Sequence, residues 1–361
     1  MFTSIAYGAK SAMAKLERME IQRDDPKDNE VVIEVLYAGV CHSDIHQVKN
    51  EWHNTLYPCV PGHEIVGRVK SAGAKTSRFK EGDMVGVGCM IDSCRQCEPC
   101  THGDQNYCEG PNGWLATYNG PMTPATETED ASNMYGRDNT YGGYSDTVVV
   151  PEDFVLSIPE GLDPKSAAPI LCAGVTTWSP MQHWGLKAGD KVAVLGFGGL
   201  GHMAAKLAKA LGAEVTVLTS TPEKIAEAKA QGADAAYVET DKASLTPLAG
   251  SFDMILSTVP EKHEIGALLD LLKRNGQFVV VGNLDVVDGV DNSKLAFKRQ
   301  SVSGSLIGNL KETQDVLDFC AANGIAPEVE MIDIAKINEA FTKVENGEVR
   351  YRYVIDMASL K

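Results

Sequence analysis

Four cysteines lie within fifteen positions of one another, at Cys94, Cys97, Cys100 and Cys108. Four thiolates this close together can surround one tetrahedral zinc ion, because Zn²⁺ binds thiolate sulfur well and its d-electrons impose no geometry. A pair of disulfides is the alternative. With nine cysteines in the whole chain, chance alone does not account for such a cluster. We therefore expect a closed structural zinc site that takes no part in chemistry.

A second set of metal-binding residue types is spread more widely. Cys41 lies in residues 39–46, His63 lies in residues 61–67, and Cys172 comes much later. Two cysteines and one histidine can hold a catalytic zinc ion whose fourth position stays open to water or substrate. Each residue alone would more often belong to the core. The same chain also carries the four-cysteine row and, at residues 196–201, a nucleotide-binding motif. In that company Cys41, His63 and Cys172 predict a catalytic zinc site.

Residues 196–201 match the G-x-G-x-x-G motif of dinucleotide-binding proteins. The motif follows an apolar strand pattern and opens a helical one, which is the context that it requires. The first glycine allows a tight turn, the second lets the backbone approach the pyrophosphate, and the third lets the helix pack closely. A glycine-rich turn without a ligand is the alternative. The expected cofactor-binding residues of this motif are Gly196, Gly198, Gly199, Leu200 and Gly201.

The residues after the next strand predict which cofactor binds. NAD-binding versions usually place an Asp or Glu there to hold the ribose 2′-hydroxyl. This chain instead has Thr219, Ser220 and Thr221, followed by Lys224. Hydroxyl groups and a positive charge suit a 2′-phosphate, which a carboxylate would repel. We predict NADP(H) over NAD(H), although these residues could also serve only as a helix N-cap ahead of Pro222.

The elements that must position these residues fall into two patterns. Up to about residue 160 the chain reads as short strands separated by glycine-containing turns, with an apolar run over residues 31–40. Residues 110–143 are predicted to be a long surface loop. From residue 163 onward strands and helices alternate, which predicts parallel strands with crossover helices. The expected strands are residues 191–195, 214–218, 252–257, 277–281, 301–306 and 351–355, and the expected helices are residues 201–211, 222–231, 263–273, 311–322 and 334–346.

Composition narrows the class of protein. Hydrophobic residues make up 43% and charged residues 23%, as in a soluble globular protein. The formal net charge of −16 argues against nucleic acid or an anionic membrane surface as the main partner. The sequence shows no secretory signal and no apolar stretch of membrane-spanning length. Clustered cysteines in such a chain suggest reduced metal ligands and a cytoplasmic location.

These motifs together resemble the zinc-dependent medium-chain alcohol dehydrogenases. Within that superfamily the chain is most similar to the cinnamyl alcohol dehydrogenase branch and its bacterial NADP-dependent aldehyde reductases. The resemblance extends from about residue 31 to residue 356 and rests on the specific segments 39–46, 57–64, 94–108, 171–174 and 198–203. Residues 110–141 depart from the family pattern, which leaves the active-site entrance less defined.

The resemblance implies a fold and a domain order. We expect an α/β Rossmann domain plus a β-rich GroES-like catalytic domain. The expected domains are 1–172, a GroES-like domain with two zinc sites; 173–307, a Rossmann NADP-binding domain; and 308–361, a segment that returns to the first domain. The family also implies a homodimer.

Roles for single residues follow from the same resemblance. Ser43 is expected to move the substrate proton and His46 to pass it to solvent. Asp44 is expected to orient His63, and Glu64 to bind zinc when substrate is absent. For Asp44 and Glu64, a plain structural hydrogen bond is the alternative. His42 is similar to the position that meets the cofactor pyrophosphate. Separately from the resemblance, the candidates to line the substrate pocket are Trp52, Trp114 and Ile307.

The expected activity is the reversible interconversion of primary alcohols and aldehydes, with two Zn²⁺ per chain and NADP(H). An apolar pocket would suit aromatic or medium-chain aliphatic substrates, and aldehyde reduction would be the usual direction in a cell. Two alternatives stay open at this point. One is a polyol or sugar dehydrogenase, and the other is a zinc- and nucleotide-binding protein without catalysis.

Overall fold

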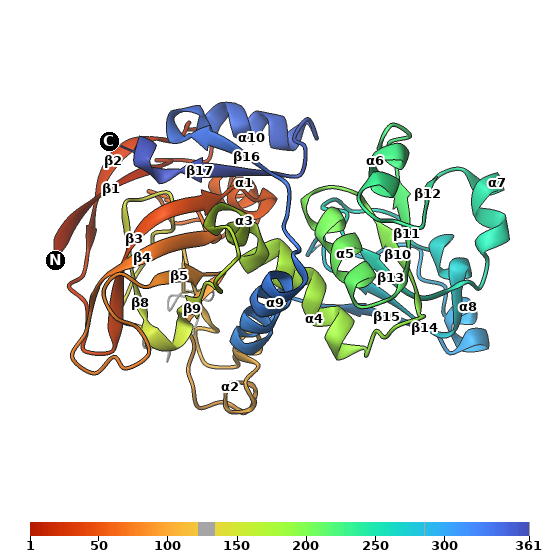
Figure 1. Ribbon diagram of the computed structural model, residues 1–361, viewed down its shortest axis with the longest axis horizontal. Coiled ribbons are helices and arrows are strands. Elements are labelled where there is room, and N and C mark those ends of the chain that lie inside the picture. The colour runs from red at the N-terminus through yellow and green to blue at the C-terminus, as the bar shows by residue number, and fades with distance from the viewer. Residues whose placement is uncertain (122–133, 285, 361) are drawn as a thin grey trace. The chain divides into compact units, whose positions relative to one another are not determined.

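The computed structural model describes residues 1–121, 134–284 and 286–360 and divides into two compact units. Unit 1 comprises Met1–Cys172 and Asn309–Lys361, and unit 2 comprises Ala173–Gly308 (Figure 1). The domain boundaries expected from the sequence lie after residues 172 and 307, whereas the units divide after residues 172 and 308. Unit 2 is thus one continuous segment, inserted between two segments that form unit 1.

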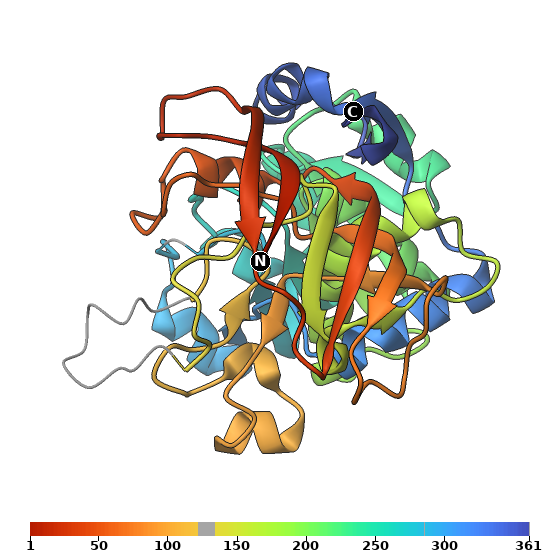
Figure 2. The same cartoon turned by 90° about the vertical axis from the view of Figure 1, so that its left-hand side faces the viewer.

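Unit 1 is rich in strands. A seven-stranded sheet has the order β16-β17-β3-β4-β5-β9, and β8 also pairs with β3. β1 and β2 run side by side as an antiparallel pair, drawn in red in Figure 2. A second small sheet joins β6 and β7. The strands are β1 (Phe2–Gly8), β2 (Glu17–Arg23), β3 (Glu30–Gly39), β4 (Ile65–Ala72), β5 (Met84–Val87), β6 (Met90–Asp92), β7 (Leu115–Ala116), β8 (Thr147–Pro151), β9 (Leu156–Ser157), β16 (Val329–Asp333) and β17 (Arg352–Asp356).

β3 is the central strand of this unit. Its sequence is rich in Val and Ile, and most of it is buried. β4, β8 and β17 all pair with it in the antiparallel direction, so it lies inside the sheet and not at its edge. The strand ends at Gly39, and the chain then passes into the first helix through Val40 and Cys41.

The longest helix of unit 1 shows how local sequence sets its bounds. α9 begins after Asn309, which forms a capping box with Glu312, and it ends at Gly324 in the left-handed conformation. Its buried residues, Thr313, Val316, Leu317 and Cys320, recur at helical spacing on one face. The helices of unit 1 are α1 (His42–Val48), α2 (Glu98–His102), α3 (Pro164–Pro169), α9 (Leu310–Asn323) and α10 (Ile337–Glu345), and a π-helical turn covers Ile170–Gly174.

Unit 2 is a parallel sheet with the strand order β12-β11-β10-β13-β14-β15. This is the doubly wound dinucleotide-binding order, in which the first strand of the unit lies centrally. Figure 1 shows α5 beside β10 and β11. The strands are β10 (Lys191–Leu195), β11 (Glu214–Thr219), β12 (Ala235–Val238), β13 (Phe252–Ser257), β14 (Leu272–Val280) and β15 (Ser301–Gly304). The helices are α4 (Val175–His183), α5 (Gly199–Ala210), α6 (Lys224–Ala230), α7 (Lys242–Leu245) and α8 (Asn292–Lys298).

The helix predicted over residues 263–273 is wrong. Glu264 forms a bridge with Asp288, and the Ile265 N–H donates to the Asp288 carbonyl, so the chain is extended where a helix would start. Only one 3₁₀ turn, Leu268–Leu271, fits before β14 begins. Apolar residues do recur at helical spacing in this segment, but the pairing of Glu264 with Asp288 outweighs that local preference for a helix. The short strand β12 was also missed.

The surface loop predicted over residues 110–143 is only partly correct where the structure describes it, and residues 122–133 lie outside the described part. Most of the described residues are irregular and Pro111, Gly136 and Asp138 are exposed, but one stretch is in the core. Leu115, Thr117 and Tyr118 are buried, and Tyr135 also belongs to the core. Among the described residues of the whole chain, none of the helices is both long enough and apolar enough to cross a membrane.

Candidate active site and metal centres

Four potential metal ligands meet inside unit 1. They are Cys41, His63, Glu64 and Cys172, and one ligand atom from each lies within 4.8 Å of all the others. Cys41 is the N-cap of α1, and His63 and Glu64 immediately precede β4. Cys172 lies in the π-helical turn. His63 Nε2 is 3.2 Å from the Cys172 sulfur. The three ligands predicted for a catalytic zinc ion are therefore brought together, with the predicted fourth residue among them.

Asp44 ties two of these ligand segments together. One carboxylate oxygen accepts the Cys41 N–H at 2.9 Å, and the other accepts the Gly62 N–H at 3.0 Å. The second oxygen also lies 3.0 Å from His63 Nδ1. Because a carboxylate only accepts hydrogen bonds, His63 Nδ1 carries a proton, and Nε2 is the ring nitrogen that faces the cluster. Asp44 is fully buried, so this arrangement is rigidly held.

Glu64 carries a carboxylate that the protein alone does not satisfy. Both oxygens are buried and neither accepts a hydrogen bond, although Arg352 Nη2 approaches Oε1 to 3.3 Å. Burial raises the pKa of Glu64 to about 8, against the opposing charge of Arg352. A side chain at position 39 would collide with this carboxylate, since a Cβ there would lie 1.8 Å from Oε2. The orphaned carboxylate beside two thiols and an imidazole fits a bound divalent cation.

An interaction between the two thiols of the cluster shifts the pKa values of both. A hydrogen bond from Cys172 holds the pKa of Cys41 well below its ordinary value, even though burial works against this. The same bond raises the pKa of Cys172. For His63, burial favours the neutral ring, but Asp44 raises its pKa overall. Thiolate, imidazole and carboxylate are the donor types that zinc takes in proteins, so the residues present fit that metal.

α1 carries the residues predicted to move a proton. The Ser43 hydroxyl lies 3.8 Å from the Cys41 sulfur. His46 is one helical turn further along the same face, and its Nδ1 pairs with Glu51. The ring of His42 is 6.1 Å from that of His46, and burial lowers the pKa of His42. Trp52, which is partly exposed, lies 5.7 Å from the His46 ring.

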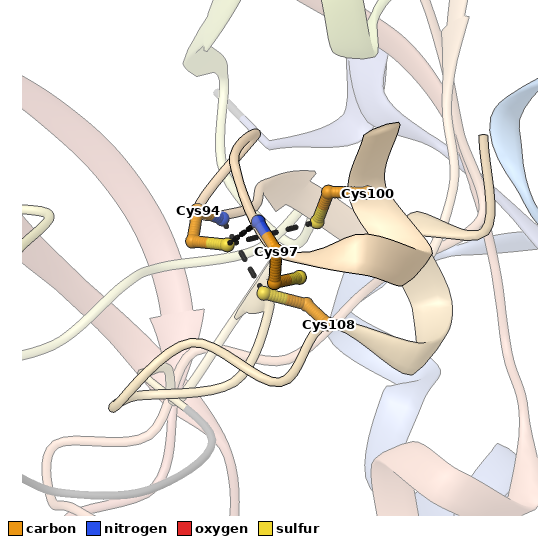
Figure 3. Close-up of side chains that lie close together, drawn as sticks. All are labelled: Cys94, Cys97, Cys100 and Cys108. Atoms are coloured by element: carbon orange, nitrogen blue, oxygen red, sulfur yellow. Dashed lines mark hydrogen bonds between the residues drawn. The ribbon is translucent and has the colours of Figure 1, made fainter. Parts of the chain in front are cut away.

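The four-cysteine row forms a second cluster in the same unit. Figure 3 shows the side chains of Cys94, Cys97, Cys100 and Cys108 pointing toward one another from the loop around α2. All nine cysteines are free thiols, so no disulfide occupies this loop. Backbone N–H groups point at the sulfurs. Such donors stabilise thiolate charge and so favour metal binding. These donor–sulfur pairs are Cys94 N to Cys108 at 3.4 Å, Cys97 N to Cys94 at 3.3 Å and Glu109 N to Cys97 at 3.4 Å.

The glycine motif of unit 2 has the geometry of a phosphate cradle. Gly196 has a φ of 86°, which L side chains rarely adopt. A Cβ on Gly201 would lie 2.1 Å from the Gly196 carbonyl oxygen, so the start of α5 packs directly on the turn. A Cβ on Gly198 would meet no protein atom within 4 Å. The protein's own packing therefore does not require a glycine at 198, whereas a ligand lying on the backbone would.

The residues predicted to face a 2′-phosphate differ in exposure. Thr219 is buried at the end of β11, and its hydroxyl accepts the Thr221 N–H at 3.2 Å. Ser220 is exposed, and Thr221 and Lys224 are half-buried. None of residues 218–221 is acidic, and Glu223 follows as the N-cap of α6. The geometry thus leaves Ser220, Thr221 and Lys224 available to a ligand and gives Thr219 a structural part.

Sequence reasoning missed several residues around the first cluster. Tyr118 lies with its ring 5.6 Å from that of His63, and the Tyr144 hydroxyl is 3.4 Å from Asp44. Arg352 reaches the cluster from β17, and interaction with Cys172 lowers the pKa of Cys89. Nothing in their local sequence signals these contacts, because each depends on the fold. The predicted pocket residue Trp114 is half-buried against the core of unit 1.

Comparison with known proteins places these two units in a family. Residues 27–160 match the model of the alcohol dehydrogenase GroES-like domain, and residues 199–322 match that of the zinc-binding dehydrogenases. The chain belongs to the zinc-dependent alcohol dehydrogenase family. The resemblance inferred from the sequence and the combination of a GroES-like with a Rossmann domain are thereby confirmed.

Individual members of the zinc-dependent alcohol dehydrogenase family match over their full length. An NADP-dependent alcohol dehydrogenase of Mycolicibacterium smegmatis is 46% identical, with 100% of both chains covered. An aldehyde reductase of Escherichia coli is also 46% identical, over 98% of each chain. The solved structure of a cinnamyl alcohol dehydrogenase from Sorghum bicolor has a TM-score of 0.93 and 40% identity, and covers 100% of this chain and 99% of its own.

Proposed function

We propose that this chain is a zinc-dependent, NADP(H)-linked enzyme that interconverts primary alcohols and aldehydes. The observation that carries the proposal is the buried cluster of Cys41, His63 and Cys172 around the unsatisfied carboxylate of Glu64. A structural zinc site has four permanent protein ligands, whereas a catalytic one needs a position that can open. The similar proteins named as alcohol dehydrogenase and aldehyde reductase support the same reaction class.

The proposed roles at the cluster follow from its geometry. A zinc ion bound there would supply Lewis-acid polarisation of the substrate oxygen. Cys41, His63 and Cys172 would hold the ion, and Asp44 would keep His63 in the required tautomer through the 3.0 Å bond to Nδ1. Glu64 would serve as a ligand when substrate is absent.

Proton movement is proposed to run along α1. The Ser43 hydroxyl would exchange the proton of the substrate oxygen, and His46, one turn away, would pass it toward solvent. The pairing of His46 with Glu51 orients the imidazole for this exchange. His42 would meet the pyrophosphate of the cofactor. Its lowered pKa keeps the ring neutral, so it would bind as a hydrogen-bond partner rather than as a charge.

The second zinc ion is proposed to bind Cys94, Cys97, Cys100 and Cys108, where it would fix the loop around α2. For NADP(H), the proposed contacts are the turn at residues 196–201, Ser220, Thr221 and Lys224. The open space at Gly198 and the absence of a carboxylate from residues 218–221 at the end of β11 support this choice. The NADP-dependent relative at 46% identity is consistent with it.

Substrate selection is proposed to involve Trp52, Trp114 and Ile307. Ile307 has a φ of 43°, a conformation that a β-branched residue rarely adopts and that is often kept at functional sites. Aromatic or medium-chain aliphatic aldehydes are the proposed substrates, reduced with NADPH in the cell. A preference for polyols over benzaldehyde and cinnamaldehyde would favour the alternative of a sugar dehydrogenase.

One experiment tests the proposal as a whole. The purified protein is analysed for metal and then assayed with NADPH against a panel of aromatic, aliphatic and sugar aldehydes. We expect about two zinc ions per chain and turnover of at least one aldehyde class. One zinc ion per chain and no oxidation of NADPH with any aldehyde would leave only the alternative of a non-catalytic zinc- and nucleotide-binding protein.

We also propose that the chain acts as a cytoplasmic homodimer. Unit 2 exposes four apolar side chains near one another in sequence, Leu284, Val286, Val290 and Phe297, of which Phe297 is 92% exposed. β15 stands at the edge of its sheet. Exposed apolar side chains and a sheet edge are each features that suit contact with a second copy of the chain. Light scattering should give twice the chain mass, and Phe297→Asp should shift the protein toward the monomer.

A further inference from the structure

Thr258 immediately follows β13 and lies next to the turn of the glycine motif. β10 and β13 are neighbouring parallel strands, with Leu195 paired to Ser257, so the loops that follow them leave the same edge of the sheet. The strand order reverses between these two strands, because α5 leads from β10 to β11 while β13 lies on the other side of β10. Dinucleotides bind in the crevice at such a reversal. Thr258 therefore borders the proposed cofactor site.

Hydrogen bonds join this threonine to the turn. The Thr258 N–H and hydroxyl donate to the Leu195 carbonyl at 2.8 and 2.9 Å, and the hydroxyl oxygen lies 3.3 Å from the Gly196 carbonyl oxygen. A Cβ on Gly196 would lie 2.9 Å from the hydroxyl oxygen, and a Cβ on Gly201 would lie 3.1 Å from it. Thr258 is buried, with 8% of its surface exposed. Its hydroxyl is thus packed directly against the first and last glycines of the motif.

The segment that carries Thr258 is fixed by the loop after β14. The Gly282 N–H donates to the Ser257 carbonyl at 3.2 Å, and the Asn283 amide donates to the Val259 carbonyl at 3.2 Å. A Cβ on Gly282 would lie 2.4 Å from the Thr258 carbonyl carbon, so the two loops pack backbone against backbone. Thr258 is therefore anchored independently of the glycine turn and can act as a fixed support for it.

We propose that Thr258 is a positioning residue for NADP(H), whose hydroxyl holds the carbonyl groups of Leu195 and Gly196 inside the protein. A carbonyl oxygen turned toward the crevice would repel a phosphate, whereas the first N–H groups of α5 have no acceptor within the helix and attract one. Gly196, with a φ of 86°, has no side chain that could restrict the turn. The Thr258 hydroxyl supplies this restriction from the neighbouring loop.

This inference rests on the proposed cofactor site at residues 196–201, and its test separates the two claims. NADPH is titrated into the full-length protein, and the dissociation constant is measured from nicotinamide fluorescence. Hydrogen–deuterium exchange of residues 195–203 is followed without and with NADPH. Thr258→Val keeps the shape of the side chain and removes the hydroxyl, whereas Thr258→Ser keeps the hydroxyl. Thr246→Val is the matched control, because it removes a hydroxyl that donates to the Lys242 carbonyl elsewhere in unit 2.

Thr258→Val should weaken NADPH binding by about tenfold, because the turn is then less firmly held in its binding conformation. It should also speed exchange at residues 195–203 in the cofactor-free protein. Thr258→Ser and Thr246→Val should keep the wild-type affinity, and melting temperatures show that each variant is folded during the titration. An unchanged dissociation constant in Thr258→Val would overturn the proposal. Equal weakening in Thr258→Ser would also overturn it, because the hydroxyl would then not be the cause.

If Thr258→Val does not fold, Thr258→Ala is compared with Thr258→Ser in its place, and equal affinities of these two variants would overturn the proposal. A wild-type protein that binds no NADPH would refute the cofactor site itself. Normal binding by the wild type without any effect of Thr258→Val would refute only the positioning role.

Discussion

The carboxylate of Asp44 and the imidazole of His63 form a buried hydrogen bond of 3.0 Å, and the same carboxylate also accepts the backbone N–H groups of Cys41 and Gly62. One side chain therefore sets both the tautomer of a proposed ligand and the spacing of the two segments that carry ligands.

Asp44→Asn should weaken the catalytic zinc site without emptying the structural one. An amide cannot accept from all three donors at once, so His63 loses its fixed tautomer. Loss of such a partner typically lowers metal affinity by roughly 10- to 100-fold. Zinc content after dialysis against graded chelator measures this, with the exposed Asp25→Asn as control. An unchanged affinity of the more weakly held zinc ion would contradict the positioning role of Asp44.

Substitution of one cysteine from each cluster should have different consequences. Cys41→Ser should abolish turnover in a protein that remains folded, because it removes a proposed catalytic ligand. Cys94→Ser should mainly lower soluble yield and thermal stability, because the loop around α2 loses its cross-link. Specific activity per folded chain and the melting temperature separate the two effects. Equal loss of specific activity in soluble, folded samples of both variants would refute the division into catalytic and structural sites.

A carboxylate placed after β11 should reverse the cofactor preference. Ser220→Asp sets a negative charge where the 2′-phosphate of NADP(H) is proposed to lie, and about 1.4 kcal/mol of repulsion is worth tenfold in affinity. We expect kcat/KM for NADPH to fall by at least this factor, with a smaller change or a gain for NADH. Lys224→Met should weaken NADPH binding in the same direction. If the wild-type enzyme already prefers NADH, the assignment of this turn is wrong.

Acid should weaken one contact that anchors α5. Asp234 bonds Lys209 at the end of α5 at 2.6 Å and accepts the Val215 N–H of β11 at 2.8 Å. The Lys209 bond comes first among the causes that lower the pKa of Asp234 in the folded protein. Its stabilising contribution is therefore present above the unfolded pKa of an aspartate and is lost as the pH falls through the lower, folded value.

The size of this effect is limited, because both side chains are partly exposed and solvent screens the pair. We expect Asp234→Asn to cost up to about 1 kcal/mol at neutral pH. The difference in unfolding free energy between wild type and variant should shrink on acidification. Urea unfolding at several pH values measures it, and a difference that grows toward low pH would contradict the sign.

The sequence predicted much of this molecule because its motifs are local. The turn of Gly196 and Gly201 and the strand before it depend on neighbours in the chain, and the row from Cys94 to Cys108 closes on itself. The predicted helix at residues 263–273 failed because the bridge between Glu264 and Asp288 is a tertiary contact.

Contacts between distant parts of the chain also hid residues of the proposed active site from the sequence analysis. Arg352 and Cys89 approach the ligand cluster only after β17 has paired with β3 and Gly88 has packed on Leu171. No spacing rule connects such residues to Cys41 or His63. Tyr118 was hidden for another reason, because the segment around it is rich in turn-forming residues and yet lies in the core.

The insertion of unit 2 within unit 1 affects the order in which a ribosome can complete the protein. Unit 2 is continuous and holds all six of its strands, so it can fold as soon as residue 308 has emerged. Unit 1 must wait for β17, which pairs with β3 near its end and brings Arg352 to Glu64. All the proposed zinc ligands are synthesised long before this last strand. The row from Cys94 to Cys108 can close early, whereas the catalytic site is finished among the last parts of the molecule.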